Sequence, residues 1–133
     1  MPHIDWDEKY ALSIREIDDQ HKRWFDIINE LHDALKSGKG PDTFEKTINS
    51  LLEYTQYHFA HEEAFMKKIN YPSFHEHRRM HDAFKNEIFN LQNEFLSGDV
   101  IMRSQVMSRL QGWLRDHILV EDRKYADFYH HPS

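Results

Sequence analysis

The sequence predicts an all-α protein, an up-down-up-down four-helix bundle with an irregular N-terminal arm and a short C-terminal helix or tail. Glycine and proline are scarce, with four of each among 133 residues, and five of these eight lie at three breaks. The four segments between the breaks repeat apolar residues in steps of three and four, which is typical of bundled helices. Strand-like alternation is absent. Short connections favour antiparallel neighbours, hence the up-down order.

Helices are predicted over about 18–37, 41–69, 72–97 and 100–119. Asp18 or Asp19 suits the N-cap of the first helix, Pro41 suits the first turn of the second, and Gly98 suits the end of the third. The residues expected to face inward, helix by helix, are His21, Trp24, Ile28, Leu31 and Leu35; Phe44, Ile48, Leu51, Thr55, His58, Glu62, Phe65 and Ile69; Phe74, His77, His81, Phe84, Ile88, Leu91 and Phe95; and Val106, Leu110, Trp113, Leu114 and His117.

The two ends of the chain carry aromatic residues outside these helices. Residues 1 to about 17 are expected to form an irregular arm whose Trp6, Tyr10 and Leu12 pack across one face of the bundle. Tyr125, Phe128 and Tyr129 indicate a terminal helix or tail that docks on the outside.

Length and composition narrow the class of protein. The length fits a single domain over residues 1–133. There is no cysteine, no signal-peptide pattern and no apolar run of the roughly 18 residues that a membrane span needs. The net charge is −6 and no basic run stands out, which disfavours nucleic acid as a partner. We therefore expect a cytoplasmic protein without membrane insertion, and a monomer.

Ionisable residues stand within the apolar seam of the predicted bundle. Without partners, buried imidazoles and carboxylates would cost several kcal/mol each, so a bound ion is expected among them. His58 and Glu62 share a helix face at a spacing of four, and His77 and His81 repeat that spacing. Asp122 follows His117 by five residues, which brings it inward only if the last helical turn is distorted. The candidate metal ligands are His21, His58, Glu62, His77, His81, His117 and Asp122.

The ligand count indicates a pair of metal ions with one vacancy. Two octahedral ions offer about 12 positions. Five imidazoles, two bridging carboxylates and one bridging oxide or hydroxide fill all but one of them. A vacant position on a redox-active pair is where a small external ligand binds. Neutral imidazoles stabilise high-valent iron less well than carboxylates, which favours reversible oxygen binding over substrate oxidation.

With these residues in view, the chain resembles the hemerythrins, in particular the single-domain bacteriohemerythrins, over nearly its whole length. The resemblance rests on four runs: Asp18-Asp19-Gln20-His21, His58-Phe59-Ala60-His61-Glu62-Glu63, His77-Arg78-Arg79-Met80-His81, and residues 113–122, Trp-Leu-Arg-Asp-His-Ile-Leu-Val-Glu-Asp.

The resemblance implies roles for these positions. One iron takes His77, His81 and His117, the other takes His21 and His58 and keeps the open position, and Glu62 and Asp122 bridge the two. Leu114 matches the family position that lines the oxygen pocket. Trp113, Ile118, Phe25 and Phe59 are expected as further residues in or behind that pocket.

The functional prediction is an oxygen-binding protein for storage, transport or delivery, not an enzyme, with an oxygen-consuming enzyme as a recipient. A di-iron enzyme (a ferroxidase, a peroxidase or a nitric-oxide-handling protein) and an oxygen or redox sensor remain alternatives that use the same site. A structural zinc site is the weakest alternative, because such sites are usually complete with four ligands. Six histidines off the seam are expected at the solvated surface, with His61 the one that could touch the site: His3, His32, His61, His75, His130 and His131.

Overall fold

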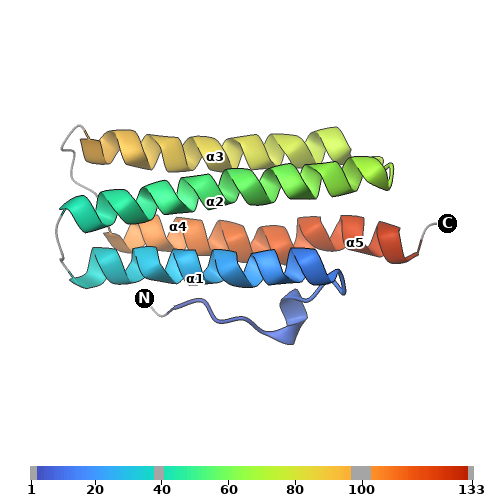
Figure 1. Ribbon diagram of the computed structural model, residues 1–133, viewed down its shortest axis with the longest axis horizontal. Helices are drawn as coiled ribbons and strands as arrows, with labels where there is room; N and C mark the ends of the chain where they lie inside the picture. The colour runs from blue at the N-terminus through green and yellow to red at the C-terminus, as the bar shows by residue number, and fades with distance from the viewer. Residues whose placement is uncertain (1–2, 38–40, 97–102, 132–133) are drawn as a thin grey trace.

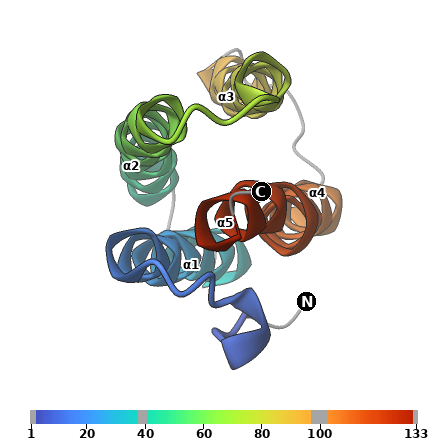
Figure 2. The same ribbon diagram turned by 90° about the vertical axis from the view of Figure 1, so that its right-hand side faces the viewer.

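Four long helices, each antiparallel to the next, form the molecule. In the computed structural model, which describes residues 3–37, 41–96 and 103–131, they are α1 (Arg15–Ser37), α2 (Pro41–Lys68), α3 (Phe74–Leu96) and α4 (Arg103–Asp116) (Figure 1). Seen end-on, the four helices surround a common interior (Figure 2). No strand occurs among the described residues. The predicted all-α bundle is thus confirmed.

The start of the first helix differs from the prediction. α1 begins at Arg15 instead of Asp18 or Asp19. Asp18 does not cap the helix: its Oδ1 accepts a hydrogen bond from the backbone N–H of Leu12 at 2.9 Å. Ser13 adopts a positive φ of 59°, so the chain turns sharply just before α1. Asp18 thus lies inside α1 and stabilises the segment that leads into the helix.

The other predicted boundaries lie close to the observed ones. α2 begins at Pro41 and ends one residue before the predicted Ile69. α3 begins at Phe74 instead of Pro72. The predicted end of the third helix and start of the fourth fall outside the described residues. The side chains of Leu35 and Phe95 are likewise outside the described part of the chain.

The last helix changes its winding instead of stopping. α4 gives way after Asp116 to one π-helical stretch, η2 (His117–Asp122), which continues into α5 (Arg123–His130). A π turn accommodates one residue more than an α turn and is often found at functional sites. The short C-terminal helix is therefore present, and the predicted end near residue 119 falls inside the π turn.

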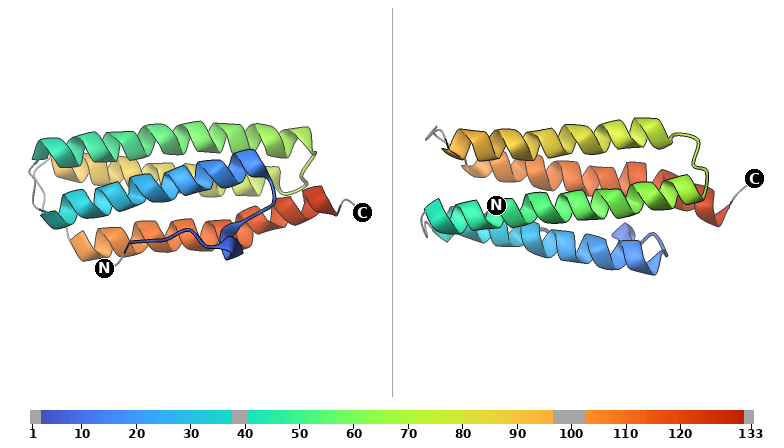
Figure 3. Two further views of the ribbon diagram at one scale, coloured as in Figure 1. Left: turned by 60° about the horizontal axis from the view of Figure 1, so that its bottom comes forward. Right: turned by 45° about the horizontal axis from the view of Figure 1, so that its top comes forward.

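The N-terminal arm lies along the bundle, as predicted. It runs back beside α1 and includes one short 3-10 turn, η1 (Glu8–Tyr10) (Figure 3). Tyr10 and Leu12 are almost fully buried. The Tyr10 and Phe25 rings are perpendicular, with their centroids 5.0 Å apart. Arg123 fastens the arm by donating to the carbonyl oxygens of Lys9 and Ala11 at 3.0 and 2.9 Å.

Two apolar clusters fill the interior, and the polar seam lies between them. The larger contains Trp24, Phe59, Phe84 and Leu114. The smaller packs α5 against the ends of α1, α2 and α3, and consists of Leu12, Ile17, Met66, Phe74, Tyr125 and Ala126. Among the described residues, no helix is both long enough and apolar enough to cross a membrane.

Candidate metal centre

The seven ionisable residues of the predicted seam are all buried, and they lie together. None is more than 4% exposed. α1 contributes one, α2 two, α3 two, and the π turn contributes the remaining two. Their ligand-type atoms form two groups that share Glu62: Glu62, His77, His81, His117 and Asp122 in one, and His21, His58 and Glu62 in the other.

The carboxylate of Glu62 faces histidines on both sides. Its Oε1 lies 3.1 Å from His77 Nε2 and 2.9 Å from His81 Nε2. Its Oε2 lies 3.1 Å from His58 Nε2 and 3.5 Å from His21 Nε2. Each oxygen therefore addresses a different set of imidazoles.

Asp122, in the π turn, is arranged in the same way as Glu62. Its Oδ1 lies 3.0 Å from His77 Nε2 and 3.1 Å from His117 Nε2, and its Oδ2 lies 3.2 Å from His21 Nε2. The π turn makes this possible, because five residues of α-helix would turn Asp122 about 140° away from His117. The two carboxylates thus divide the five histidines into a group of three and a group of two.

Most of these short contacts lack the direction of a hydrogen bond. Among the described residues, the Nε2 atoms of His21, His58, His81 and His117 have no hydrogen-bond partner, and neither has either oxygen of Asp122. An unsatisfied buried polar atom costs about 1–3 kcal/mol. Atoms that converge without bonding one another fit ions placed between them, and nitrogen with oxygen donors suits iron, copper or zinc. The donor set therefore fits a metal site.

Opposite charges dominate the electrostatics of the cluster. Burial by itself lowers the pKa of His21, but the nearby carboxylates of Asp122 and Glu62 favour the charged imidazole, outweigh burial and raise the pKa to about 9. The same balance raises the pKa of His77 to about 10. Burial raises the pKa of Asp122, yet the surrounding histidines, His117 foremost, lower it overall. In His58 burial prevails and lowers the pKa.

Three further side chains hold the ligands in place. His58 Nδ1 donates to Gln20 Oε1 at 2.8 Å, and His81 Nδ1 donates to Glu63 Oε2 at 2.9 Å. With the proton on Nδ1, each ring directs the lone pair of Nε2 to the centre, an outer-shell arrangement common in metal sites. The buried Tyr125 hydroxyl donates to Glu62 Oε2 at 3.0 Å.

Sequence reasoning did not assign these three supporting roles. Tyr125 was foreseeable, because it follows Asp122 by three residues and so shares its helix face. Gln20 and Glu63 carry no such signal. Glu63 points about 100° away from Glu62 along α2, and its contact with α3 arises only once the two helices pack.

Aromatic rings form the apolar wall of the centre. Phe59 stacks on His81 with ring centroids 3.7 Å apart and an interplanar angle of 1°. The half-buried Trp113 stacks on His117 at 4.3 Å and 12°. Trp24 lies 4.9 Å from His58, centroid to centroid.

The remaining predicted pocket residues are buried at different places. Leu114 and Ile118 are fully enclosed in the larger cluster. Phe25 is also buried, but its ring packs with Trp6 and Tyr10 of the arm. A role for each of the three in the ligand pocket stays a prediction.

Of the histidines outside the seam, His32 was wrongly predicted to lie at the solvated surface. His32 is only 5% exposed, because the arm covers it: the His3 ring lies 5.0 Å from the His32 ring. His61 is half-buried, and its Nε2 lies 3.5 Å from Glu16 Oε2. The exposed His130 donates from Nε2 to the carbonyl of Leu12 at 2.9 Å.

Comparison with known proteins decides the family. The model of the hemerythrin HHE cation binding domain matches residues 12–129. The chain belongs to the hemerythrin family. It is 33% identical to a bacteriohemerythrin of Pseudomonas aeruginosa (strain UCBPP-PA14), over 98% of this chain and 84% of that one. A bacteriohemerythrin of Clostridium acetobutylicum is 31% identical, over 92% of this chain and 98% of that one.

A solved structure agrees with this assignment. A wild-type hemerythrin crystal structure superimposes with a TM-score of 0.87 at 29% identity, covering 94% of this chain and 96% of the other. Membership of the hemerythrin family and the buried cluster of histidines and carboxylates together support a di-iron site.

Proposed function

We propose that the protein binds molecular oxygen reversibly at a pair of iron ions held by the seven buried residues. One observation carries the proposal: each of the two carboxylates directs one oxygen to the three-histidine group and the other to the two-histidine group. A carboxylate with this orientation is suited to bridge two ions.

The division of ligands supports a specific assignment of the two ions. His77, His81 and His117 would hold one iron, His21 and His58 would hold the other, and Glu62 and Asp122 would be shared between them. The second iron would have one protein ligand fewer and so would keep the open position. When bound, the iron pair supplies the electrons that hold oxygen reversibly.

The chain itself keeps water away from the site. Trp24 and Phe59 are fully buried beside the histidines. The indole N–H of Trp24 donates to Thr55 Oγ1 at 3.1 Å, so it is directed away from the site. Excluding water slows the loss of bound oxygen in a reduced form, which is what a carrier requires.

We infer a carrier for storage, transport or delivery rather than an enzyme. Five of the seven proposed ligands are imidazoles, which stabilise high-valent iron less well than the carboxylate-rich sets of ferritin-like proteins. The proposed partner is oxygen itself, with an oxygen-consuming enzyme as the recipient.

Cycles of oxygenation test this function. The protein is reduced without air, oxygen is added and then removed, and the visible spectrum is followed throughout. We expect an absorption band that appears and disappears over repeated cycles, with one oxygen per iron pair. Asp122→Asn, which weakens the bridge, is expected to lack the band. A wild-type spectrum that never returns to the reduced form contradicts a carrier and favours a di-iron oxidase.

A further inference from the structure

A second group of metal-ligating side chains lies between the arm and α1. It comprises His3 from the arm and His32 and Asp33 from α1, with one ligand-type atom of each within 4.8 Å of the others. His3 Nε2 lies 2.6 Å from Asp33 Oδ1, and His32 Nδ1 lies 3.5 Å from the same oxygen. The group shares no residue with the di-iron centre. His32 follows His21 by 11 residues, about 16 Å along the helix.

The backbone of the arm is fixed beside this group. Asn29 clamps Ile4 with two hydrogen bonds: its Oδ1 accepts from the Ile4 N–H and its Nδ2 donates to the Ile4 carbonyl, both at 2.9 Å. Asn29 precedes Asp33 by one helical turn, so both side chains lie on one face of α1. The clamp therefore holds the neighbouring His3 over Asp33, and little ordering remains for a ligand to impose.

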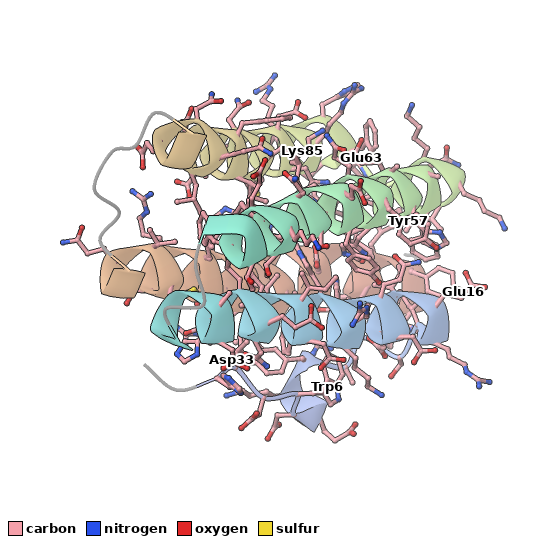
Figure 4. All side chains as sticks on the ribbon, turned by 60° about the vertical axis from the view of Figure 1, so that its left-hand side comes forward. Trp6, Glu16, Asp33, Tyr57, Glu63 and Lys85 are labelled. Atoms are coloured by element: carbon pink, nitrogen blue, oxygen red, sulfur yellow. The ribbon has the colours of Figure 1, made fainter. Side chains whose placement is uncertain are left out.

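The group is open on one side and enclosed on the other. The side chains of His3 and Asp33 are 42% and 63% exposed, whereas that of His32 is 6% exposed. Figure 4 shows Asp33 on the side of α1 that carries the arm. An ion can enter from solvent and meet a fixed imidazole beneath it. The pKa of Asp33 is lowered, chiefly by the hydrogen bond from His3, so the carboxylate is ionised at neutral pH.

We propose that His3, His32 and Asp33 form a second metal site that binds one Zn²⁺ ion and latches the arm to α1. Two imidazoles and a carboxylate, with water in the fourth position, make a set typical of open tetrahedral zinc sites. Hard ions such as Mg²⁺ prefer oxygen ligands and are disfavoured by two nitrogens. A plain surface ion pair is the alternative, and such pairs contribute little.

Calorimetric titration with ZnCl₂ tests the site in the iron-loaded protein. His3→Ala and Asp33→Asn each remove one ligand from the solvent side. His131→Ala removes an exposed imidazole elsewhere and serves as the matched control. Loss of an outer-shell partner costs a metal site about 10- to 100-fold in affinity, so loss of a direct ligand is expected to cost at least that. We expect such weakening in the two test variants and wild-type affinity in the control.

Thermal unfolding gives a second readout. Zn²⁺ that binds only the folded chain raises Tm by mass action. The shift is expected in the wild type and in His131→Ala, and it should vanish in His3→Ala. Iron content is measured before and after titration, so that exchange at the di-iron centre is recognised. Absence of zinc binding in the wild type, or equal binding and equal Tm shifts in all variants, overturns the site. Neither result bears on oxygen binding, since no residue is shared.

Discussion

Glu62 is the residue on which most contacts of the metal centre converge. Its two oxygens lie close to four histidines. Its Oε2 also accepts a hydrogen bond from the Tyr125 hydroxyl. The surrounding histidines, with His58 the largest contributor, outweigh the effect of burial and lower the pKa of Glu62 well below its usual range. The carboxylate is thus held ionised, as its proposed role as a bridging ligand requires.

Tyr125→Phe tests whether the hydroxyl orients Glu62. The ring, which lies 5.6 Å from that of His77, is kept. Loss of the buried hydrogen bond should release iron to a chelator more readily, with affinity lowered about 10- to 100-fold. Tyr129→Phe, at a side chain that is 45% exposed, is the control. Equal iron retention in both variants would remove Tyr125 from the support of the site.

Leu114→Ala tests the predicted place of Leu114 in the ligand pocket. Leu114 is fully buried one turn before His117, and truncation there leaves a cavity at a cost of about 2–5 kcal/mol in the free energy of unfolding. We expect the cavity to admit water and to speed autoxidation of the oxygenated protein, followed as decay of the visible band. Leu110→Ala, one turn further from the site in the same cluster, controls for the loss of stability. Equal autoxidation rates in wild type and Leu114→Ala would exclude Leu114 from the pocket.

The raised pKa values of two histidines predict opposite pH responses with and without metal. In the metal-free protein, the pKa values of His21 and His77 rise from 6.5 to about 9 and about 10. Their contribution to stability is complete below pH 6.5 and is lost as the pH rises through those values. The pKa values of Glu62 and Asp122 are lowered, so their contribution is present above pH 4.5 and is lost only in acid.

Thermal unfolding of the loaded and chelator-treated protein measures this response. Metal-free stability should be greatest between about pH 4.5 and 6.5 and should decline towards pH 10. Metal binding displaces the same protons, so iron affinity should rise over that range. The difference in Tm between the two forms is expected to widen from pH 6.5 to pH 9. A constant difference would mean that His21 and His77 do not bind metal.

At the scale of elements, the π turn is the feature that completes the centre. It places His117 and Asp122 on one face and carries the chain into α5, where Tyr125 reaches Glu62. A spacing of five residues in the sequence indicated a distortion there, because an ordinary α-helix would separate the two side chains.

Insertion of one alanine after Val120 tests the π turn. Val120 is 51% exposed, so the added residue need not disturb the core directly. It should rotate everything that follows by about 100° and carry Asp122 away from His117. We expect iron content to fall sharply while the far-ultraviolet spectrum stays helical. The same insertion after His131, beyond α5, should leave iron unchanged; if both insertions retain iron, the spacing is not decisive.

Helix boundaries illustrate what sequence alone predicts poorly. Asp18 reads as an N-cap because aspartate commonly caps helices, yet its carboxylate accepts from Leu12 across a turn at the end of the arm. That turn depends on where the arm docks, which local residue preferences do not encode. The same docking buries His32, which sequence reasoning placed at the surface.

For the whole molecule, the fold and the buried ligand candidates were predictable from one pattern. Ionisable residues placed in an apolar stripe identify both the inward face and the need for an ion, so His58 and Glu62 could be found without a structure. Gln20 and Glu63 could not, because their contacts depend on which helix faces which. Interactions between helices are set by packing, whereas interactions within one helix follow from spacing.

The most direct test of the metal centre is the iron content of the purified wild-type protein beside Glu62→Gln. The substituted amide keeps the shape of the side chain but lacks the charge that a bridging ligand supplies. We predict two iron ions per chain in the wild type and a clear loss in the variant. A wild-type iron content near zero, or two irons retained in Glu62→Gln, would contradict a di-iron centre bridged by this residue.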